Sequence, residues 1–215
     1  MILFAWLAGR GAIVVAGVRR MAITTQERKE ALAAAAEQEL KGLEARGVRM
    51  AGNAFSPVVL VKGELNDAER SGDPLLSGAD GTALRAALGA IGWEPQDLCV
   101  LATVAGSGDE AVAGGLTAGE PLPVDLFREA LEALDPEAVI LLDDAAADLL
   151  RETYADALAI IEDFDTAMLK PGLIAPVLGR RVLALDGFEA ALSQPAEKQR
   201  MWAYLKQMPP LGAPY

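Results

Sequence analysis

Three polar residues follow an apolar run in the first third of the chain, and they are the first candidates for chemistry. The run extends from Val58 to Val61, and Glu64, Asn66 and Asp67 come shortly after it. Carboxylates and an amide grouped at the end of a strand can transfer protons, position a water molecule or hold a metal ion. The same residues also suit an ordinary polar loop, because Asn and Asp side chains cap turns. Both interpretations stay open from the sequence.

A strand, a glycine-rich loop and a helix would hold these residues in place. The apolar run predicts a strand over 58–62 that ends at Gly63, and apolar residues at helical spacing predict a helix over about 81–91. In open α/β sheets, ligands bind in the crevice beside the carboxyl ends of the strands. The sequence therefore predicts a site at the end of this strand.

The rest of the chain alternates strands and helices. Further strands are predicted over 98–104 and 138–142, and the segments 173–177 and 182–185 form either a hairpin or two strands of the sheet. Helices are predicted over 24–47, over 124–134 and over 195–207, and the first of them begins with a capping box of Thr24 and Glu27. A further helix is predicted to begin after a cap at Asp143 or Asp144 and to run through 145–151 and beyond. This alternation predicts an α/β fold: three αβα layers with a central, mostly parallel four-stranded sheet.

The absence of histidine restricts the chemistry more than any residue that is present. Catalytic triads that depend on an imidazole are excluded, and so are histidine metal ligands. The single cysteine, Cys99, cannot form a disulfide within the chain or build a thiolate cluster, and its apolar surroundings predict a buried side chain. Any acid–base catalysis would therefore use Asp, Glu, Lys or Tyr side chains. We expect no cofactor and no metal site.

The charge balance bears on the partner. The formal net charge is -12, which argues against tight nonspecific binding of DNA, because such binding depends on Lys and Arg that displace counterions. Two basic clusters, Arg180 with Arg181 and Lys198 with Arg200, are expected to be solvated. We therefore expect a protein partner ahead of DNA, and a basic partner would suit an acidic protein. A small nucleobase-like ligand in the strand-end crevice stays open.

The two ends of the chain differ from its middle. Residues 1–20 are apolar, but Arg10 would cost about 2.5–3.5 kcal/mol near the centre of a bilayer, and no basic start precedes the apolar run as in a secretory signal. We expect a start assigned too far upstream and a cytoplasmic protein that begins at Met21, without a membrane segment; a membrane anchor is the alternative. Residues 21–208 are expected to form one domain, and 209–215 a loose tail.

Four segments, in this order, resemble motifs of the uracil-DNA glycosylase superfamily, most closely its iron–sulfur-containing bacterial and archaeal branch. The first is V-V-L-V-K-G-E from Val58, which is similar to the family's strand ending in Gly-Glu-Ala-Pro-Gly. The others are R-S-G-D-P-L-L-S-G-A-D-G-T-A-L from Arg70, D-P-E-A-V-I-L-L-D-D-A-A-A-D-L-L from Asp135 and L-S-Q-P-A-E-K-Q-R-M-W-A-Y-L-K from Leu192. The resemblance implies an α/β domain of a class that flips uracil out of DNA into a pocket.

The chain departs from the family where the family does its chemistry. The first motif keeps Gly63 and Glu64 but replaces Ala-Pro-Gly with Leu65, Asn66 and Asp67. Four other working positions hold residues of different chemistry: Leu75 for the ring that stacks on uracil, Thr103 for the base-reading asparagine, Ser107 for a cluster cysteine, and Asp186 for the histidine that wedges into DNA.

The resemblance therefore implies the fold and argues against the activity. Losing one donor from such a site typically costs ~2.7–4 kcal/mol of barrier, and here several groups are missing together. We expect a protein of uracil-DNA glycosylase fold that has lost glycosylase activity and acts as a binding or accessory protein linked to DNA repair. The alternative is a nucleobase- or nucleotide-binding protein, or a residually active hydrolase that uses Glu64 or Asp67. A pocket closed by Leu75 and its neighbours would favour the first expectation, and an open cavity on which Glu64 and Asp67 converge would favour the alternative.

Overall fold

The computed structural model describes residues 25–94, 96–106 and 115–212. The chain divides into two compact units, Met1–Ala35 and Ala36–Tyr215, and helix α1 (Thr25–Glu44) runs across the division. Only Thr25–Ala35 of the first unit is described. The leader predicted over 1–20, the start of the predicted domain and the proposed cap at Thr24 lie outside the described residues, as do Ser107 and the end of the predicted tail.

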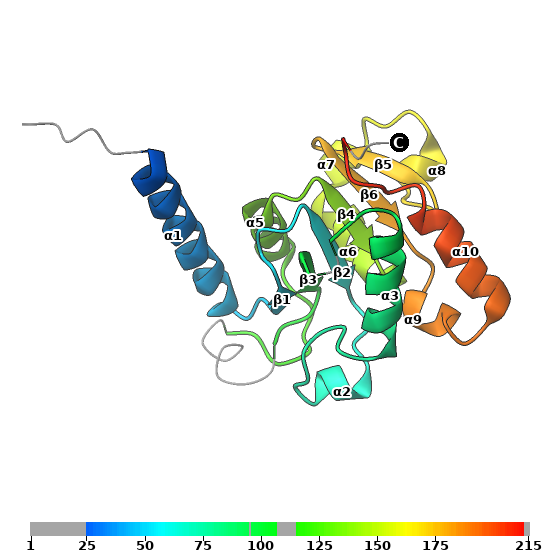
Figure 1. Ribbon diagram of the computed structural model, residues 1–215, viewed down its shortest axis with the longest axis horizontal. Helices are drawn as coiled ribbons and strands as arrows, with labels where there is room; N and C mark the ends of the chain where they lie inside the picture. Colours follow the sequence, from blue (N-terminus) through cyan, green and yellow to red (C-terminus); the bar gives the residue numbers. More distant parts are fainter. Residues whose placement is uncertain (1–24, 95, 107–114, 213–215) are drawn as a thin grey trace, which may run out of the picture. The chain divides into compact units, whose positions relative to one another are not determined.

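The second unit is built on a six-stranded mixed sheet (Figure 1). Its order is β1-β3-β2-β4-β6-β5, and the strands span Met50–Gly52 (β1), Val58–Lys62 (β2), Leu98–Ala102 (β3), Ala138–Leu141 (β4), Ile174–Val177 (β5) and Arg180–Ala184 (β6). The four central strands run parallel, and β1 and β5 lie antiparallel at the two edges. The sequence analysis was therefore right about a mostly parallel sheet and wrong about four strands.

The chain leaves β2 in one direction and returns to its other side. β2 connects through α3 to its neighbour β3, and β3 connects through α5 to β4, which pairs with the opposite edge of β2. The connection that leaves β2 therefore runs toward one edge of the sheet and the connection that leaves β4 toward the other, so the two diverge between these neighbouring strands. This is the point at which open α/β sheets form a ligand crevice outside the carboxyl ends of the strands.

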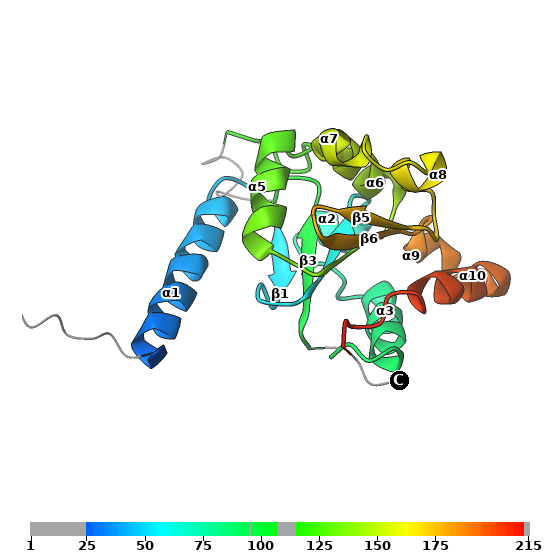
Figure 2. The same ribbon diagram turned by 90° about the horizontal axis from the view of Figure 1, so that it is seen from above.

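Helices cover both faces of the sheet. They are α2 (Asp67–Arg70), α3 (Ala79–Ala90), α5 (Val124–Leu134), α6 (Asp144–Thr153), α7 (Ala155–Leu158), α8 (Phe164–Ala167), α9 (Phe188–Ala191) and α10 (Pro195–Leu205). Figure 2 shows α5, α6, α7 and α8 on one side of the sheet and α3, α9 and α10 on the other. Among these described helices and α1, none combines the length and apolar character that a membrane crossing requires.

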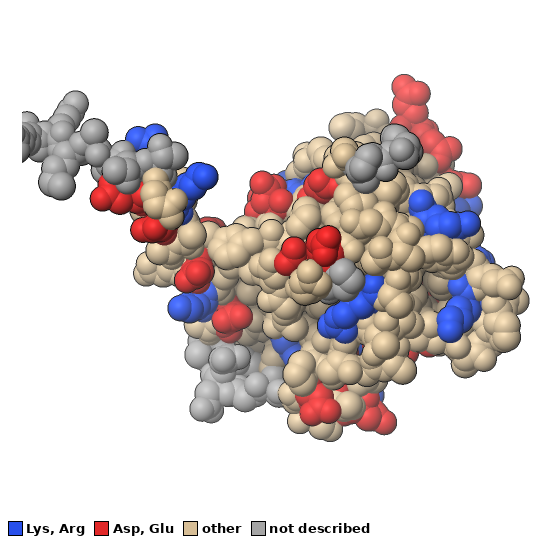
Figure 3. Space-filling model, in the orientation of Figure 1, with Lys and Arg blue, Asp and Glu red and all other residues tan. Residues whose placement is uncertain are grey.

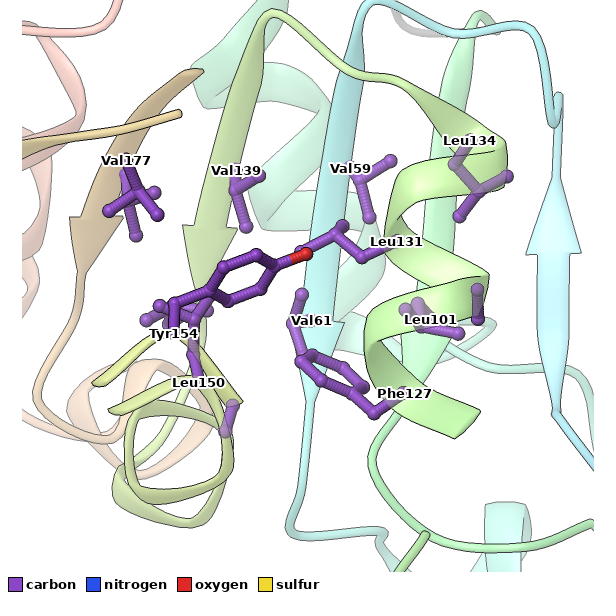
Figure 4. Close-up of a cluster of buried hydrophobic side chains, with 14 of the residues drawn as sticks. Val59, Val61, Leu101, Phe127, Leu131, Leu134, Val139, Leu150, Tyr154 and Val177 are labelled. Atoms are coloured by element: carbon purple, nitrogen blue, oxygen red, sulfur yellow. The ribbon is translucent and has the colours of Figure 1, made fainter. Parts of the chain in front are cut away.

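Two apolar clusters lie between the sheet and these helices. Alternate residues of each buried strand serve opposite faces: Val59 and Val61 of β2 join the cluster under α5, α6 and α7, whereas Val58 and Leu60 join the cluster with α3, α9 and α10. Burying each such side chain contributes about 1.5–3 kcal/mol. In Figure 4 the Tyr154 ring lies among the first cluster with its hydroxyl toward Leu131.

Most long elements match the sequence analysis. Strand β2 and helix α5 have the predicted bounds, Asp143 is the N-cap of α6, and β5 and β6 form a hairpin within the sheet. Strand β3 ends at Ala102 rather than at Val104, and α10 ends at Leu205. Strand β1 and the short helices α2, α7, α8 and α9 were not predicted, because elements of three or four residues are too short to show a hydrophobic period.

Candidate functional site

A pocket of about 310 Å³ opens at the carboxyl ends of the central strands. Its walls come from the segments that follow β2, β4 and β6, together with residues of α2, α3 and α9. The lining residues are Lys62, Glu64, Leu65, Asn66, Arg70, Leu76, Asp80, Leu142, Asp143, Gly187, Phe188, Glu189 and Ala190. The pocket thus lies at the divergence of β2 and β4, and its volume is at the lower end of the range for small-molecule sites.

A buried lysine forms one wall of this pocket. Lys62 is the last residue of β2, and its Nζ forms ion pairs with Glu69 at 2.8 Å, Asp80 at 2.7 Å and Glu189 at 2.9 Å. Burial alone would lower the pKa of Lys62, but the bonds to Asp80, Glu69 and Glu189 outweigh it and raise the pKa above its ordinary value. Lys62 therefore stays charged at neutral pH.

Three different helices supply the partners of Lys62. Glu69 lies in α2, where its side chain accepts a bond from the backbone amide of Asn66 in a capping box and a second from that of Leu76. Asp80 lies in the first turn of α3, where the helix dipole favours a carboxylate. Glu189 lies in the first turn of α9 and is the exposed member, with 48% of its side chain accessible.

Asp143 ties the loop after β2 to the helix after β4. As N-cap of α6, its carboxylate accepts a bond from the backbone N–H of Ala146 at 2.9 Å. The same carboxylate accepts bonds from the amides of Gly63 and Glu64, the latter at 3.0 Å. A Cβ at Gly63 would lie 2.7 Å from the Asp143 carboxylate and 2.9 Å from the amide nitrogen of Ala146, so the close approach requires glycine.

The pocket has an acidic and an apolar part. Four carboxylates line it, from Glu64, Asp80, Asp143 and Glu189, against two cations, Lys62 and Arg70. An apolar wall is formed by Leu65, Leu76, Leu142, Phe188 and Ala190. An ammonium group has three N–H donors, and three carboxylates surround that of Lys62. The pocket therefore offers a ligand carboxylate acceptors and an apolar surface, with donors from the Asn66 amide and the Arg70 guanidinium.

The structure brings only part of the predicted trio to the pocket. Glu64 and Asn66 line it, and the Asn66 side chain also accepts a bond from the amide of Glu69 at 2.9 Å. The Asp67 side chain is fully exposed, pairs with Arg70 at 2.9 Å and is not a lining residue. The N–H of Gly63 is engaged by Asp143, so that donor is not directed at a ligand.

The other predicted binding residues lie outside the pocket wall. Leu75 is buried and does not line the pocket, so it does not fill it. Thr103 is buried after β3, where its N–H donates to the carbonyl of Lys62 at 2.9 Å. Asp186 is solvent-accessible and pairs with Arg200 at 2.9 Å, while its neighbour Gly187 lines the pocket.

Sequence analysis missed most of the lining residues, among them Lys62, Asp80, Phe188 and Glu189. A signal was present for Lys62, because a lysine that ends an apolar strand run needs a counter-charge if that strand is buried. No comparable signal marked its partners, which lie in three separate helices, 7, 18 and 127 positions along the chain from Lys62. In the described part of the chain, no group of three or more Asp, Glu or Cys side chains is arranged to hold a metal ion.

Comparisons with known proteins add no relative. A scan against protein-family models gives no match for this chain, and neither does a search of the curated proteins.

Proposed function

We propose that this chain is a uracil-DNA glycosylase-like protein of three αβα layers that has lost base excision and binds a small nucleobase-like ligand in its strand-end pocket. Two observations support the proposal. The four motif-like segments occur in the family's order, and Glu64, which the first of them keeps, lines the pocket together with Asn66 from the stretch that replaces Ala-Pro-Gly. The observation that carries the ligand-binding part is the pocket itself, which Leu75 does not close.

The lining selects the class of ligand. Carboxylates accept hydrogen bonds and repel phosphate, so nucleotides are poor candidates. Uracil presents carbonyl oxygens that need donors. Three carboxylates surround the Lys62 ammonium. The side-chain donors left on the wall are therefore the Asn66 amide and the Arg70 guanidinium, which contacts Asp67 through one nitrogen, and four lining carboxylates stand against them. Bases with exocyclic amino groups present donors, as in adenine and cytosine. We therefore propose a preference for amino-bearing bases or nucleosides over uracil.

The placement of the motif positions supports the proposed loss of excision. The positions that resemble the family's stacking ring and base-reading amide are Leu75 and Thr103, and neither lines the pocket. Asp186, at the position of the wedging histidine, is paired with Arg200. Residual hydrolysis is the second candidate function, and it is favoured by one observation: Glu64 has a carboxylate on the pocket wall, where it could orient a water molecule.

Thermal-shift measurements test the ligand class. We expect adenine, cytosine or their nucleosides to raise the melting temperature, uracil to raise it less, and dUMP to have no effect. Ala190→Trp should abolish the shift, because a large side chain on the wall fills the pocket. Ala196→Trp, on an exposed position of α10 outside the pocket, is the matched control and should leave the shift unchanged. Absence of a shift with every base and nucleoside would reject ligand binding.

A cleavage assay on uracil-containing single-stranded DNA tests the loss of activity. We expect no abasic sites above background. Robust cleavage that disappears in Glu64→Gln but survives in Asp67→Asn would establish the hydrolytic alternative, because only Glu64 lines the pocket.

The proposal includes a protein partner and a cytoplasmic location. On the face shown in Figure 3, Lys and Arg side chains are interspersed with Asp and Glu side chains and form no broad basic field. That distribution supports a protein partner over DNA, whose binding depends on clustered cations.

A further inference from the structure

An apolar surface lies on the segments that follow α6, and its hollows share no lining residue with the strand-end pocket. Ile160 and Phe164 are 81% and 71% exposed, and Met168 is also exposed. These side chains belong to α8 and to the segments directly before and after it. We call the residues 155–171 that carry them the α7–α8 surface. Large apolar side chains exposed together in one short segment are typical of an interaction site.

Two adjoining hollows give this surface its shape. One, of about 390 Å³, is lined by Ala155, Leu158 and Ile161 among others, and the second, of about 270 Å³, by Ala147, Leu169, Pro171 and Ala184 among others. Both hollows share Arg151, Phe164 and Met168 as a common wall. The surface is thus divided into two neighbouring, mainly apolar depressions, each large enough for a side chain.

The rim of these hollows is acidic. Glu152, Asp156, Glu162, Asp163 and Asp165 lie within or beside the α7–α8 surface, and acidic side chains stand out over the loop before α8 at the upper right of Figure 3. The local cations already have partners within the chain: Arg151 pairs with Asp148, Lys170 with Asp165 at 2.7 Å, and Arg128 with Asp156 at 3.8 Å. The rim therefore has a surplus of negative charge.

We propose that the α7–α8 surface binds a basic amphipathic helix of a partner protein. Two apolar side chains of that helix, spaced i and i+4, would occupy the two hollows, and flanking Lys or Arg would face the acidic rim. Charge complementarity selects this occupant. A second copy of the chain, with net charge -12, would bring like charge to the rim, and DNA or an anionic membrane would be repelled. The inference does not depend on the strand-end pocket.

Fluorescence anisotropy with designed peptides tests the proposal. The probe is a labelled helix of about four turns with Leu at i and i+4 and Lys elsewhere on the polar face. We expect saturable binding that weakens as salt is raised. A matched peptide with Glu in place of Lys should not bind, and a peptide with the same composition but scattered Leu should bind at least about tenfold more weakly.

Protein variants locate the binding surface. Phe164→Ala should weaken binding of the Lys/Leu peptide by about tenfold or more, and Glu162→Lys should weaken it further at low salt. Phe55→Ala removes another exposed aromatic side chain far along the chain and should leave binding unchanged. Both Phe164 and Phe55 are exposed, so neither change is expected to disturb the fold.

Three outcomes would overturn the inference. They are absence of binding by the Lys/Leu peptide, equal binding by parent and Phe164→Ala, and a concentration-dependent dimer in sedimentation that Phe164→Ala abolishes. The last would assign the surface to a second copy of the chain. Failure of nucleobase binding at the strand-end pocket would affect none of these measurements, because Ala190→Trp and Phe164→Ala alter separate sites.

Discussion

The carboxylate of Asp143 accepts hydrogen bonds from the backbone amide of Gly63, at 3.1 and 2.9 Å to its two oxygens. The two residues are 80 positions apart in the sequence and follow adjacent parallel strands. Their contact fixes the loop that carries Glu64 and Asn66 against the start of α6. The geometry of the candidate pocket therefore depends on a hydrogen bond between the loop that precedes α2 and the residue that caps α6.

Asp143→Ala is expected to destabilise the protein by about 2–4 kcal/mol, because it removes a helix cap and leaves the amides of Gly63 and Glu64 without their acceptor. Urea unfolding measures the change. Asp144→Ala is the control: its side chain is exposed in the first turn of α6, and its loss should cost less than about 1 kcal/mol. Equal losses in the two variants would contradict the bridging role.

Gly63→Ala is expected to lower stability by about 1–3 kcal/mol, because the added Cβ meets atoms of α6 at under 3 Å. Gly42→Ala makes the same chemical change inside α1, where nothing lies within 4 Å of the new Cβ. That control should gain about 0.5–1 kcal/mol from better helix propensity. Thermal or urea unfolding of both variants measures the two changes in stability, which should have opposite signs. A Gly63→Ala protein as stable as the parent would show that the loop can move away from α6 without cost.

Lys62→Met is expected to cost about 3–5 kcal/mol, because it leaves the buried carboxylates of Glu69 and Asp80 without a counter-charge. The loss should shrink when Glu69→Gln and Asp80→Asn are added, since neutral amides do not need the cation. Lys198→Met, on an exposed position of α10, should change stability by less than about 0.5 kcal/mol. A Lys62→Met protein as stable as the parent would show that the cluster contributes nothing to folding.

The buried thiol of Cys99 is expected to make the protein less stable at alkaline pH. Burial raises the pKa of its thiol from 9.0 to about 12, so between these values the folded state keeps a proton that the unfolded state has released. Stability should then fall as pH rises from 9.0 toward 12, with a slope of up to about 1.4 kcal/mol per pH unit. Cys99→Ala removes this slope, so the difference in unfolding free energy between parent and variant should narrow as pH rises.

Thiol labelling checks the same residue independently. A colorimetric thiol reagent at about pH 8 should react with the native protein only as fast as the protein opens, because the thiol is buried and protonated. Rapid reaction of the whole sample would show that Cys99 is accessible, and the expected pH slope would then be absent.

The elements could be predicted because their signals are local. The apolar run 58–62 alternates its side chains between two buried faces, and α5 shows an apolar stripe at helical spacing, so each pattern is contained in a few adjacent residues. The position of the site followed from a general property of parallel sheets, whose strand ends meet at one edge. The burial of Cys99 followed in the same way from its apolar neighbours.

By itself, the sequence determined the mostly parallel α/β arrangement, the absence of imidazole chemistry, and the placement of Glu64 and Asn66 at a strand end. The tertiary structure alone decided that Lys62 would meet Glu69, Asp80 and Glu189, the last of which is 127 positions away. It also decided that Asp67 would point to solvent and that Leu75 would leave the pocket open. The reason is physical: local periodicity fixes which segments are strands and helices, whereas the partners of a buried charge depend on which segments pack together at the end of the sheet.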